Sequence, residues 1–398
     1  MRPARTYPER RDGVRLLVVD SNGQRLCVTT MAALPELLGD GDLLVVNDAA
    51  TLPASLLGHD DAGHALEARL SSPPEGARAS AVLLGAGDWH QRTEDRPPPP
   101  PLPLGAQISF GDLRAVIDSA GPLSPRQVTL RFDRDGDALW AALYRHGRPV
   151  QYSHLAHDLP LWAVQTVYAA RPFAVEMPSA GRPLSWEILL ALRARGVRWA
   201  ALTHAAGLSA TGDAAIDAAL PLPERYDIPP ATVLAISETR RRGGRVIAVG
   251  TTVVRALEGA ATSHGGRLIA GAGVTDLRLS PSYRPLIVDG VLSGTHERAS
   301  SHAALLGAFT DPDLLERAVT VAEAEDFATH ELGDAMLVLT PSAAVTKTDD
   351  GSFTSFFCGD SQVAFNYRHA AAAVSPPAAA DARPCPGAGR AQLRGAHV

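Results

Sequence analysis

The stretch at residues 245–261, RVIAVGTTVVRALEGAA, places a glycine and two hydroxyl groups between an apolar run and a helical pattern. VIAVG is predicted to be a buried strand, and VVRALEGAA to be a helix. Backbone N–H groups at a helix N-terminus, together with threonine hydroxyls, are suited to binding a small polar ligand. An ordinary helix cap explains the residues equally well, and a P-loop is excluded because its lysine is missing.

Two other patterns fit their chemistry poorly. Residues 207–211, GLSAT, begin like the nucleophile elbow of a serine hydrolase, but Thr211 stands where the second glycine is required. Residues 270–273, AGAG, lack the spacing of a dinucleotide-binding fingerprint, and we interpret them as a glycine turn. Neither pattern predicts a site.

Histidines and arginines form local groups. The pairs His59/His64 and His154/His157 lie in polar turns without the cysteines or carboxylates of a metal site, so no metal is expected. Arginines cluster at residues 193–198 and 240–245, near predicted helix ends. Interaction with the helix dipole and solvent is favoured there, and a phosphate-contacting surface is the alternative.

The elements that would position these groups alternate along the chain. LLVVN at residues 43–47 is a predicted strand that ends in Asn47 and Asp48, and loops leaving strand ends in α/β folds commonly carry function. After residue 151, helices and strands alternate. This pattern predicts an α/β core, either an irregular barrel or a mainly parallel sheet with helices.

Between these parts the sequence changes character. Residues 54–148 contain short alternating runs bounded by Gly, Pro, Asp or Ser, which predict a small inserted β-barrel domain. The core is then discontinuous, formed by residues 1–53 and 149–370. Residues 371–398 are rich in Ala, Pro and Gly, and we expect them to be disordered.

Composition narrows the class of protein. The 398 residues carry a formal net charge of −6 and three widely spaced cysteines without a CxxC pair. No signal peptide and no run of about 18 apolar residues is found. We therefore expect a soluble cytoplasmic protein with no membrane partner and no disulfide framework.

Five blocks carry a resemblance to a known family. They are LLVVNDAATLPASLLG, QTVYAARPFAVEMPSAG, RVIAVGTTVVRALEGA, VTDLRLSPSYRPLIVDGVLSGTH and LGDAMLVL, in that order between Leu43 and Leu339. The series resembles the S-adenosylmethionine:tRNA ribosyltransferase-isomerases of the queuosine pathway. The resemblance implies an α/β core with an inserted β-barrel, which agrees with the pattern above.

The resemblance also implies a reaction. The ribosyl part of S-adenosylmethionine is transferred to 7-aminomethyl-7-deazaguanine (preQ1) at the wobble position of tRNA, and epoxyqueuosine forms as adenine and methionine leave. S-adenosyl-L-methionine is then a co-substrate, tRNA is the partner, and no tightly bound cofactor or metal is expected. We expect a monomer.

Matching positions supply the implied site. The catalytic candidates are Asp48, His204, Glu224, Asp276, His296 and Asp334. The candidates for binding S-adenosylmethionine are Asn47, Gln165, Tyr168, Ser179, Ala180, Gly181, Gly250, Thr251, Thr252 and Arg255. The reaction needs a base for a C5′ proton that the sulfonium makes acidic, a neutral amine nucleophile, and protonation of or hydrogen bonding to the leaving adenine.

Several family residues are replaced. The family's His-x-x-His-x-Glu segment is LPLPE at residues 220–224, which keeps Glu224 and loses both histidines. Its Asn-Phe-His-Leu-Pro-Lys-Ser segment is GTHERAS at residues 294–300, which keeps His296 and loses the lysine. Two other hypotheses therefore stay open: an S-adenosylmethionine-using enzyme with a different acceptor, and a non-catalytic binding protein on the same scaffold.

Overall fold

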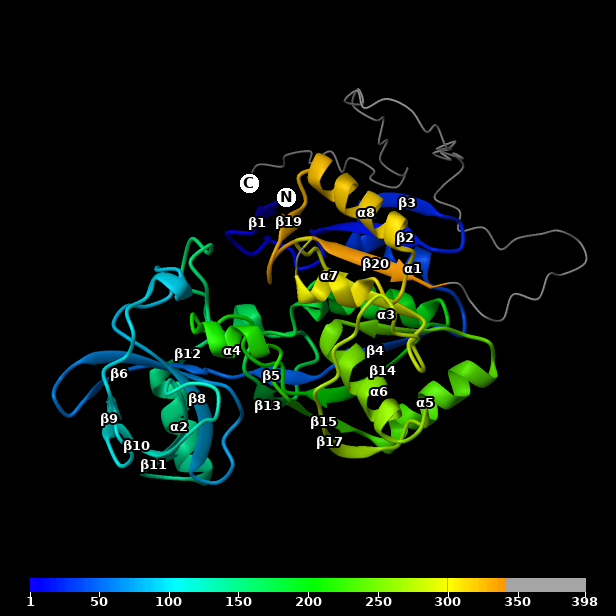
Figure 1. The fold of residues 1–398 in the computed structure, drawn as a ribbon. Helices are drawn as coiled ribbons and strands as arrows, with labels where there is room; N and C mark the ends of the chain where they lie inside the picture. The colour runs from blue at the N-terminus through cyan, green and yellow to red at the C-terminus, as the bar shows by residue number, and fades with distance from the viewer. Residues whose placement is uncertain (299, 341–398) are drawn as a thin grey trace, which may run out of the picture.

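The computed structural model describes residues 1–298 and 300–340. They form an α/β core and a β-barrel, which lies at the lower left of Figure 1. Within these residues no helix is long and apolar enough to cross a membrane.

The core is built on a nine-stranded mixed sheet with strand order β17-β15-β14-β4-β16-β18-β20-β2-β3. The bounds are β2 Arg15–Asp20, β3 Arg25–Thr30, β4 Leu43–Asn47, β14 Arg198–His204, β15 Glu224–Ile228, β16 Val246–Val249, β17 Gly271–Thr275, β18 Gly290–Gly294 and β20 Ala335–Leu339. The four central strands β14, β4, β16 and β18 are mutually parallel. Two small sheets pair β1 (Arg2–Pro3) with β19 (Ala328–Thr329) and β5 (Ala49–Thr51) with β13 (Arg171–Ala174).

Both faces of the core sheet are buried. Alternate residues of one strand point to opposite faces, so Leu43 and Val45 join one apolar cluster while Leu44 and Val46 join the other. Helices cover each face: α1 (Leu34–Leu37) and α3 (Trp186–Ala194) pack in one cluster, and α5 (Pro230–Arg241), α6 (Thr251–Ser263), α7 (Ser301–Leu306) and α8 (Pro312–Ala324) in the other. The near-continuous apolar runs of the central strands follow from this double coverage.

The barrel closes because its first and last strands pair. Its strands are β6 Ser55–Asp60, β7 Ala65–Leu70, β8 Arg78–Leu84, β11 Gln127–Phe132, β10 Leu113–Ala120 and β9 Gln107–Phe110, and β9 pairs back onto β6. At the closure a Cβ on Gly58 would lie 2.4 Å from the carbonyl oxygen of Ser109, so glycine is required there. Helix α2 (Gly136–His146) packs on the barrel core, and β12 (Gly147–Arg148) pairs antiparallel with β6.

The remaining elements are short. They are α4 (Ala214–Ala219) and four 3₁₀ turns, η1 Met31–Ala33, η2 Thr93–Asp95, η3 Leu161–Val164 and η4 Ser179–Gly181.

The predicted α/β core with an inserted β-barrel is confirmed, and the core is an open sheet rather than an irregular barrel. The glycine turn predicted at residues 270–273 is wrong, because residues 271–275 form the edge strand β17. Gly273 is needed there for a different reason: a Cβ would lie 2.4 Å from the Tyr226 hydroxyl, so glycine lets that ring lie over the strand. The division into residues 1–53, 54–148 and 149–370 remains our proposal, and residues 371–398 lie outside the described part.

Candidate active site at the carboxyl edge of the core sheet

The candidate site lies where the four central strands end. Because β14, β4, β16 and β18 are parallel neighbours, their carboxyl ends meet at one edge of the sheet. His204 ends β14, Asn47 ends β4, and Gly250 follows β16. Ligands of open α/β sheets bind outside such an edge.

Asn47 ties two of these strand ends together. Its side-chain oxygen accepts hydrogen bonds from the backbone N–H groups of His204 (2.9 Å) and Ala49 (3.1 Å). Its side-chain nitrogen donates to the carbonyl oxygen of His204 (3.0 Å) and to the hydroxyl of Thr252 (3.4 Å). Asn47 therefore positions His204 and the start of α6 rather than offering free polar atoms.

The turn into α6 depends on a glycine. Gly250 is the N-cap residue, with φ +90° and ψ 157°, a backbone conformation found almost only in glycine. In the part of the chain that the structure describes, no side chain caps the first-turn N–H groups of α6. Thr251 and Thr252 are both half-buried beside them. This end of the helix carries the positive end of its dipole, which favours an anionic group.

A buried ion pair lies behind this turn. Arg255, one turn into α6, pairs with Glu224 at the start of β15. The Nε2 atom of His204 lies 3.5 Å from the same carboxylate oxygen. The Glu224 carboxylate also accepts the N–H of Gly207 at 2.7 Å, and Arg255 donates to the carbonyl oxygen of Leu277 at 3.0 Å.

Burial shifts the pKa values of all three groups. Desolvation, reinforced by the Arg255 charge, lowers the pKa of His204 to about 3, so the ring is neutral near pH 7. Desolvation raises the pKa of Glu224 even though Arg255 opposes the shift. Desolvation likewise lowers the pKa of Arg255, against the effect of Glu224. The site thus combines a neutral imidazole with a carboxylate of increased basicity.

The predicted QTVYA and SAG segments pack against the same edge. A Cβ on Gly250 would lie 3.4 Å from the Cβ of Ala180, and a Cβ on Gly181 would lie 2.0 Å from the Tyr168 hydroxyl. Gly181 therefore allows the Tyr168 ring to approach the backbone. Gln165 makes two 2.9 Å hydrogen bonds with the backbone of Thr51, so its amide has a structural role. Ser179 begins the 3₁₀ turn η4.

Buried polar atoms without partners mark this region. In residues 1–298 and 300–340, six buried side-chain nitrogen or oxygen atoms have no hydrogen-bond partner. Five of them belong to candidate-site residues or their neighbour: both ring nitrogens of His204, Nη2 of Arg255, the Tyr168 hydroxyl and the Thr166 hydroxyl. Because buried polar groups are normally hydrogen-bonded, these atoms need a water molecule or a polar ligand as partner.

Three aspartates are also catalytic candidates, and each has different partners. Asp48 accepts the hydroxyl of Thr203 at 2.6 Å, and desolvation raises its pKa. Asp276 is exposed, and its charge acts on Arg255. Asp334 accepts three hydrogen bonds from Arg15 and one from the backbone of Ala328, so its carboxylate joins β20 to β2 instead of facing the other candidates.

His296 follows β18 and belongs to a histidine group. Its Nε2 atom lies 2.8 Å from the Ser293 hydroxyl, and its ring stacks on His302 of α7 with centroids 4.6 Å apart. Desolvation, with His302 and His330 adding to it, lowers the pKa of His296 to about 3. His302 was not among the predicted residues. It is, with Ser301, one of two polar positions in a six-residue helix, and no motif singles it out.

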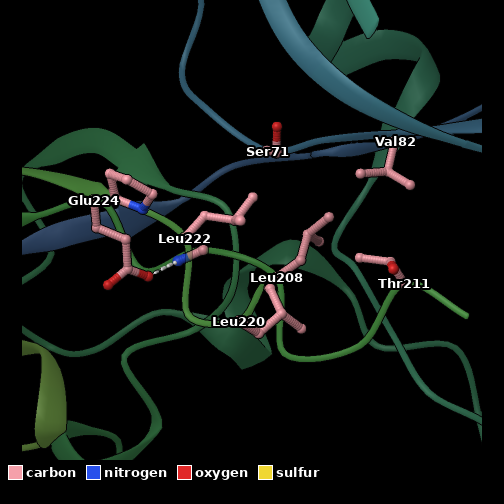
Figure 2. Close-up of a pocket in the computed structure, with 9 residues that line it drawn as sticks. Ser71, Val82, Leu208, Thr211, Leu220, Leu222 and Glu224 are labelled. Atoms are coloured by element: carbon pink, nitrogen blue, oxygen red, sulfur yellow. Dashed lines mark hydrogen bonds between the residues drawn. The ribbon is translucent and has the colours of Figure 1, made fainter. Parts of the chain in front are cut away.

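A small pocket lies on the barrel side of Glu224. Figure 2 shows Glu224 at one end and Thr211 at the other, with Leu208, Leu220 and Leu222 between them. Ser71 and Val82 of the barrel close the opposite wall. The pocket therefore lies between the barrel and the core, and its middle is apolar.

The chain is an α/β protein with an inserted β-barrel and a candidate ligand site at the strand edge. The family model described as "Queuosine biosynthesis protein" matches residues 2–338. The chain is 37% identical over 336 residues to the S-adenosylmethionine:tRNA ribosyltransferase-isomerase of Anaeromyxobacter sp. (strain K), covering 83% of this chain and 93% of that protein. It is 32% identical over 340 residues to the enzyme of the same name from Trichlorobacter lovleyi, covering 84% and 95%.

A solved structure, that of an S-adenosylmethionine tRNA ribosyltransferase from Thermotoga maritima, aligns with a TM-score of 0.46 and 24% identity, covering 85% of this chain and 96% of that chain. On the sequence matches, the chain belongs to the queuosine biosynthesis protein family, whose curated members are named as transferase-isomerases. The resemblance stated from the sequence is confirmed.

Proposed function

We propose that the protein transfers the ribosyl moiety of S-adenosylmethionine to the preQ1 base at the tRNA wobble position and isomerises it, giving epoxyqueuosine with release of adenine and methionine. The observation that carries the proposal is that, among the residues the structure describes, the buried polar atoms without a hydrogen-bond partner include those of His204, Arg255, Tyr168 and Thr166. The names of the relatives supply the substrates, since each is called an S-adenosylmethionine:tRNA ribosyltransferase-isomerase.

In this proposal the start of α6 binds the polar end of S-adenosylmethionine. The helix dipole and the first-turn N–H groups favour the methionine carboxylate, and the Thr251 and Thr252 hydroxyls can bond the carboxylate or the ribose. Gly250 brings the backbone close without a side chain in the way. Asn47 holds this turn beside His204.

Glu224 is our candidate for the base that removes the C5′ proton. The sulfonium makes this proton acidic, and a buried carboxylate with a raised pKa is a stronger base than one in water. Arg255 stabilises the anionic form before the transfer. His204, neutral near pH 7, can hydrogen-bond the leaving adenine through a ring nitrogen.

The apolar pocket beside Glu224 favours a second candidate function. Leu222 lines it where the His-x-x-His-x-Glu motif, ending at Glu224, would place its second histidine, so the acceptor side of the site is changed. An enzyme that uses S-adenosylmethionine with another acceptor would fit this change. The two functions share the α6 site and differ in the second substrate.

The experiment that tests the shared part is equilibrium binding of S-adenosylmethionine by calorimetry. Losing one hydrogen bond of about 1.4 kcal/mol weakens binding about tenfold, so we expect at least this for T252A and more for T251A/T252A. T262A is the matched control, because Thr262 lies near the other end of α6 and is exposed. Unchanged affinity in the double variant would show that the site assignment is wrong.

A further inference from the structure

A second cluster of ionisable groups shares no residue with the Glu224–Arg255 centre. It consists of His154, from the loop between β12 and η3, and His330 and Glu331, from the turn between β19 and β20. One nitrogen from each imidazole and one carboxylate oxygen lie within 4.8 Å of one another. The His154 Nε2 atom lies 3.1 Å from Glu331 Oε2, and the two imidazole rings stack with centroids 4.4 Å apart.

The backbone holds His330 in an unusual conformation. Its φ is +67°, in the left-handed region that non-glycine residues rarely adopt. A hydrogen bond from the Gly333 N–H to the His330 carbonyl oxygen (3.0 Å) closes the turn. Such conformations persist where the surrounding structure imposes them, and they concentrate at ligand sites.

The charges around the cluster favour a cation. Glu331 and Glu176 line the same small cavity, next to Tyr152. In the described ranges 1–298 and 300–340, no arginine or lysine forms an ion pair with either carboxylate. His154 is the one ion-pair partner that these ranges give to Glu331, and it is cationic only when protonated. A bound cation would compensate the Glu331 carboxylate.

We propose that His154, His330 and Glu331 bind a divalent transition-metal ion of the Zn²⁺ class. Two imidazoles and one carboxylate are donors that Zn²⁺ binds commonly, and three protein ligands leave a coordination position for water or substrate. Ligand atoms of a tetrahedral site lie closer than 4.8 Å, so the side chains would draw together on binding. The ion would join two segments that are 176 residues apart in sequence (154 and 330).

The metal itself is the probe. Zn²⁺ binding to the full chain is measured by competition with a chromophoric chelator, and Co²⁺ replaces Zn²⁺ to give visible d–d absorption bands. We expect one tight site in the wild-type protein and at least about tenfold weaker binding in H154A and in H330A. Because cysteines elsewhere in the chain also bind Zn²⁺, the difference between wild type and variants is the readout.

Two further variants separate ligation from folding. E331Q keeps a side chain of the same shape but removes the anionic ligand, and we expect weaker Zn²⁺ binding and weaker Co²⁺ bands. H90A is the matched control, because it removes an exposed histidine that pairs with Asp88. The H90A variant should bind metal as tightly as wild type. Zn²⁺ should also raise the Tm of wild type but not of H330A. Equal Zn²⁺ affinity in wild type, H330A and E331Q, or no Co²⁺ bands in wild type, would overturn the proposal.

Discussion

Glu224 and Arg255 form a buried ion pair between β15 and α6, and the His204 ring lies 3.5 Å from the same carboxylate oxygen. The Glu224 and Arg255 side chains are only 9% and 7% exposed, and His204 is fully buried. Three titratable groups are thus held together, away from water, at the edge of the sheet where α/β proteins bind ligands. This arrangement is the centre of the proposed mechanism.

Removing one partner of this pair should destabilise the fold. E224Q leaves the Arg255 charge buried without its carboxylate, and we expect the free energy of unfolding to fall by about 3 kcal/mol. Urea denaturation measures it. In E94Q, which breaks the exposed Arg92–Glu94 pair, the loss should stay below about 1 kcal/mol. Equal losses in the two variants would argue against a buried, energetically coupled pair.

Gly250→Ala should strain the turn into α6. The added Cβ would sit 3.4 Å from Ala180, which is an ordinary contact, so the penalty comes from the backbone at φ +90°. We expect a loss of about 1–3 kcal/mol in unfolding free energy and weaker S-adenosylmethionine binding. Gly39→Ala is the control, because Gly39 is exposed and has open space around it. A Gly250→Ala protein as stable as Gly39→Ala would contradict the requirement for glycine.

Asn47→Ala should remove the hydrogen bonds that link the ends of β4 and β14. The variant leaves the buried N–H groups of His204 and Ala49 without their acceptor, and we expect at least about 2 kcal/mol of lost stability together with weaker S-adenosylmethionine binding. The exposed Asn22 gives the comparison: N22A should change neither quantity. Denaturation measures the stability of both variants, and calorimetry measures their affinity for S-adenosylmethionine. An N47A protein with wild-type affinity would show that Asn47 is not part of the binding site.

The buried His204 should make stability depend on pH. Its folded pKa is about 3 against an ordinary 6.5, so between these values the unfolded chain binds a proton that the folded chain excludes. Stability therefore falls as pH drops below 6.5, by about 1.4 kcal/mol per pH unit for this group, or about 2 kcal/mol from pH 6.5 to 5. Unfolding curves of H204Q should show a shallower fall, while those of H59Q, which changes an exposed histidine, should follow wild type. Parallel curves for H204Q and wild type would contradict the lowered pKa.

Local patterns in the sequence were sufficient for one part of the site and insufficient for another. The strand-to-helix change at Gly250 and the strand end at Asn47 are visible as runs of apolar residues followed by polar ones, and both lie where they were expected. The pairing of Arg255 with Glu224 is not visible in this way, because the partners meet only when β15 pairs in the sheet beside α6.

The histidine groups show the same limit more strongly. The sequence pairs His154 with its near neighbour His157. In the structure His154 instead contacts His330 and Glu331, which lie far from it along the chain. Asp334 is predicted to be catalytic because it matches a family motif, and that role stays a prediction; its hydrogen bonds with Arg15 are not visible in the sequence. Contacts between distant segments decide both cases, and a periodic pattern carries no information about them.

The proposed reaction is tested by incubating the protein with S-adenosylmethionine and preQ1-modified tRNA, followed by chromatography of the released bases and mass spectrometry of the digested tRNA. We expect adenine and methionine in equal amounts, epoxyqueuosine in the tRNA, and at least about a hundredfold slower release in E224Q, because a general base is lost. Adenine release without modified tRNA would instead indicate another acceptor. No adenine release by a protein that binds S-adenosylmethionine would contradict the proposed reaction.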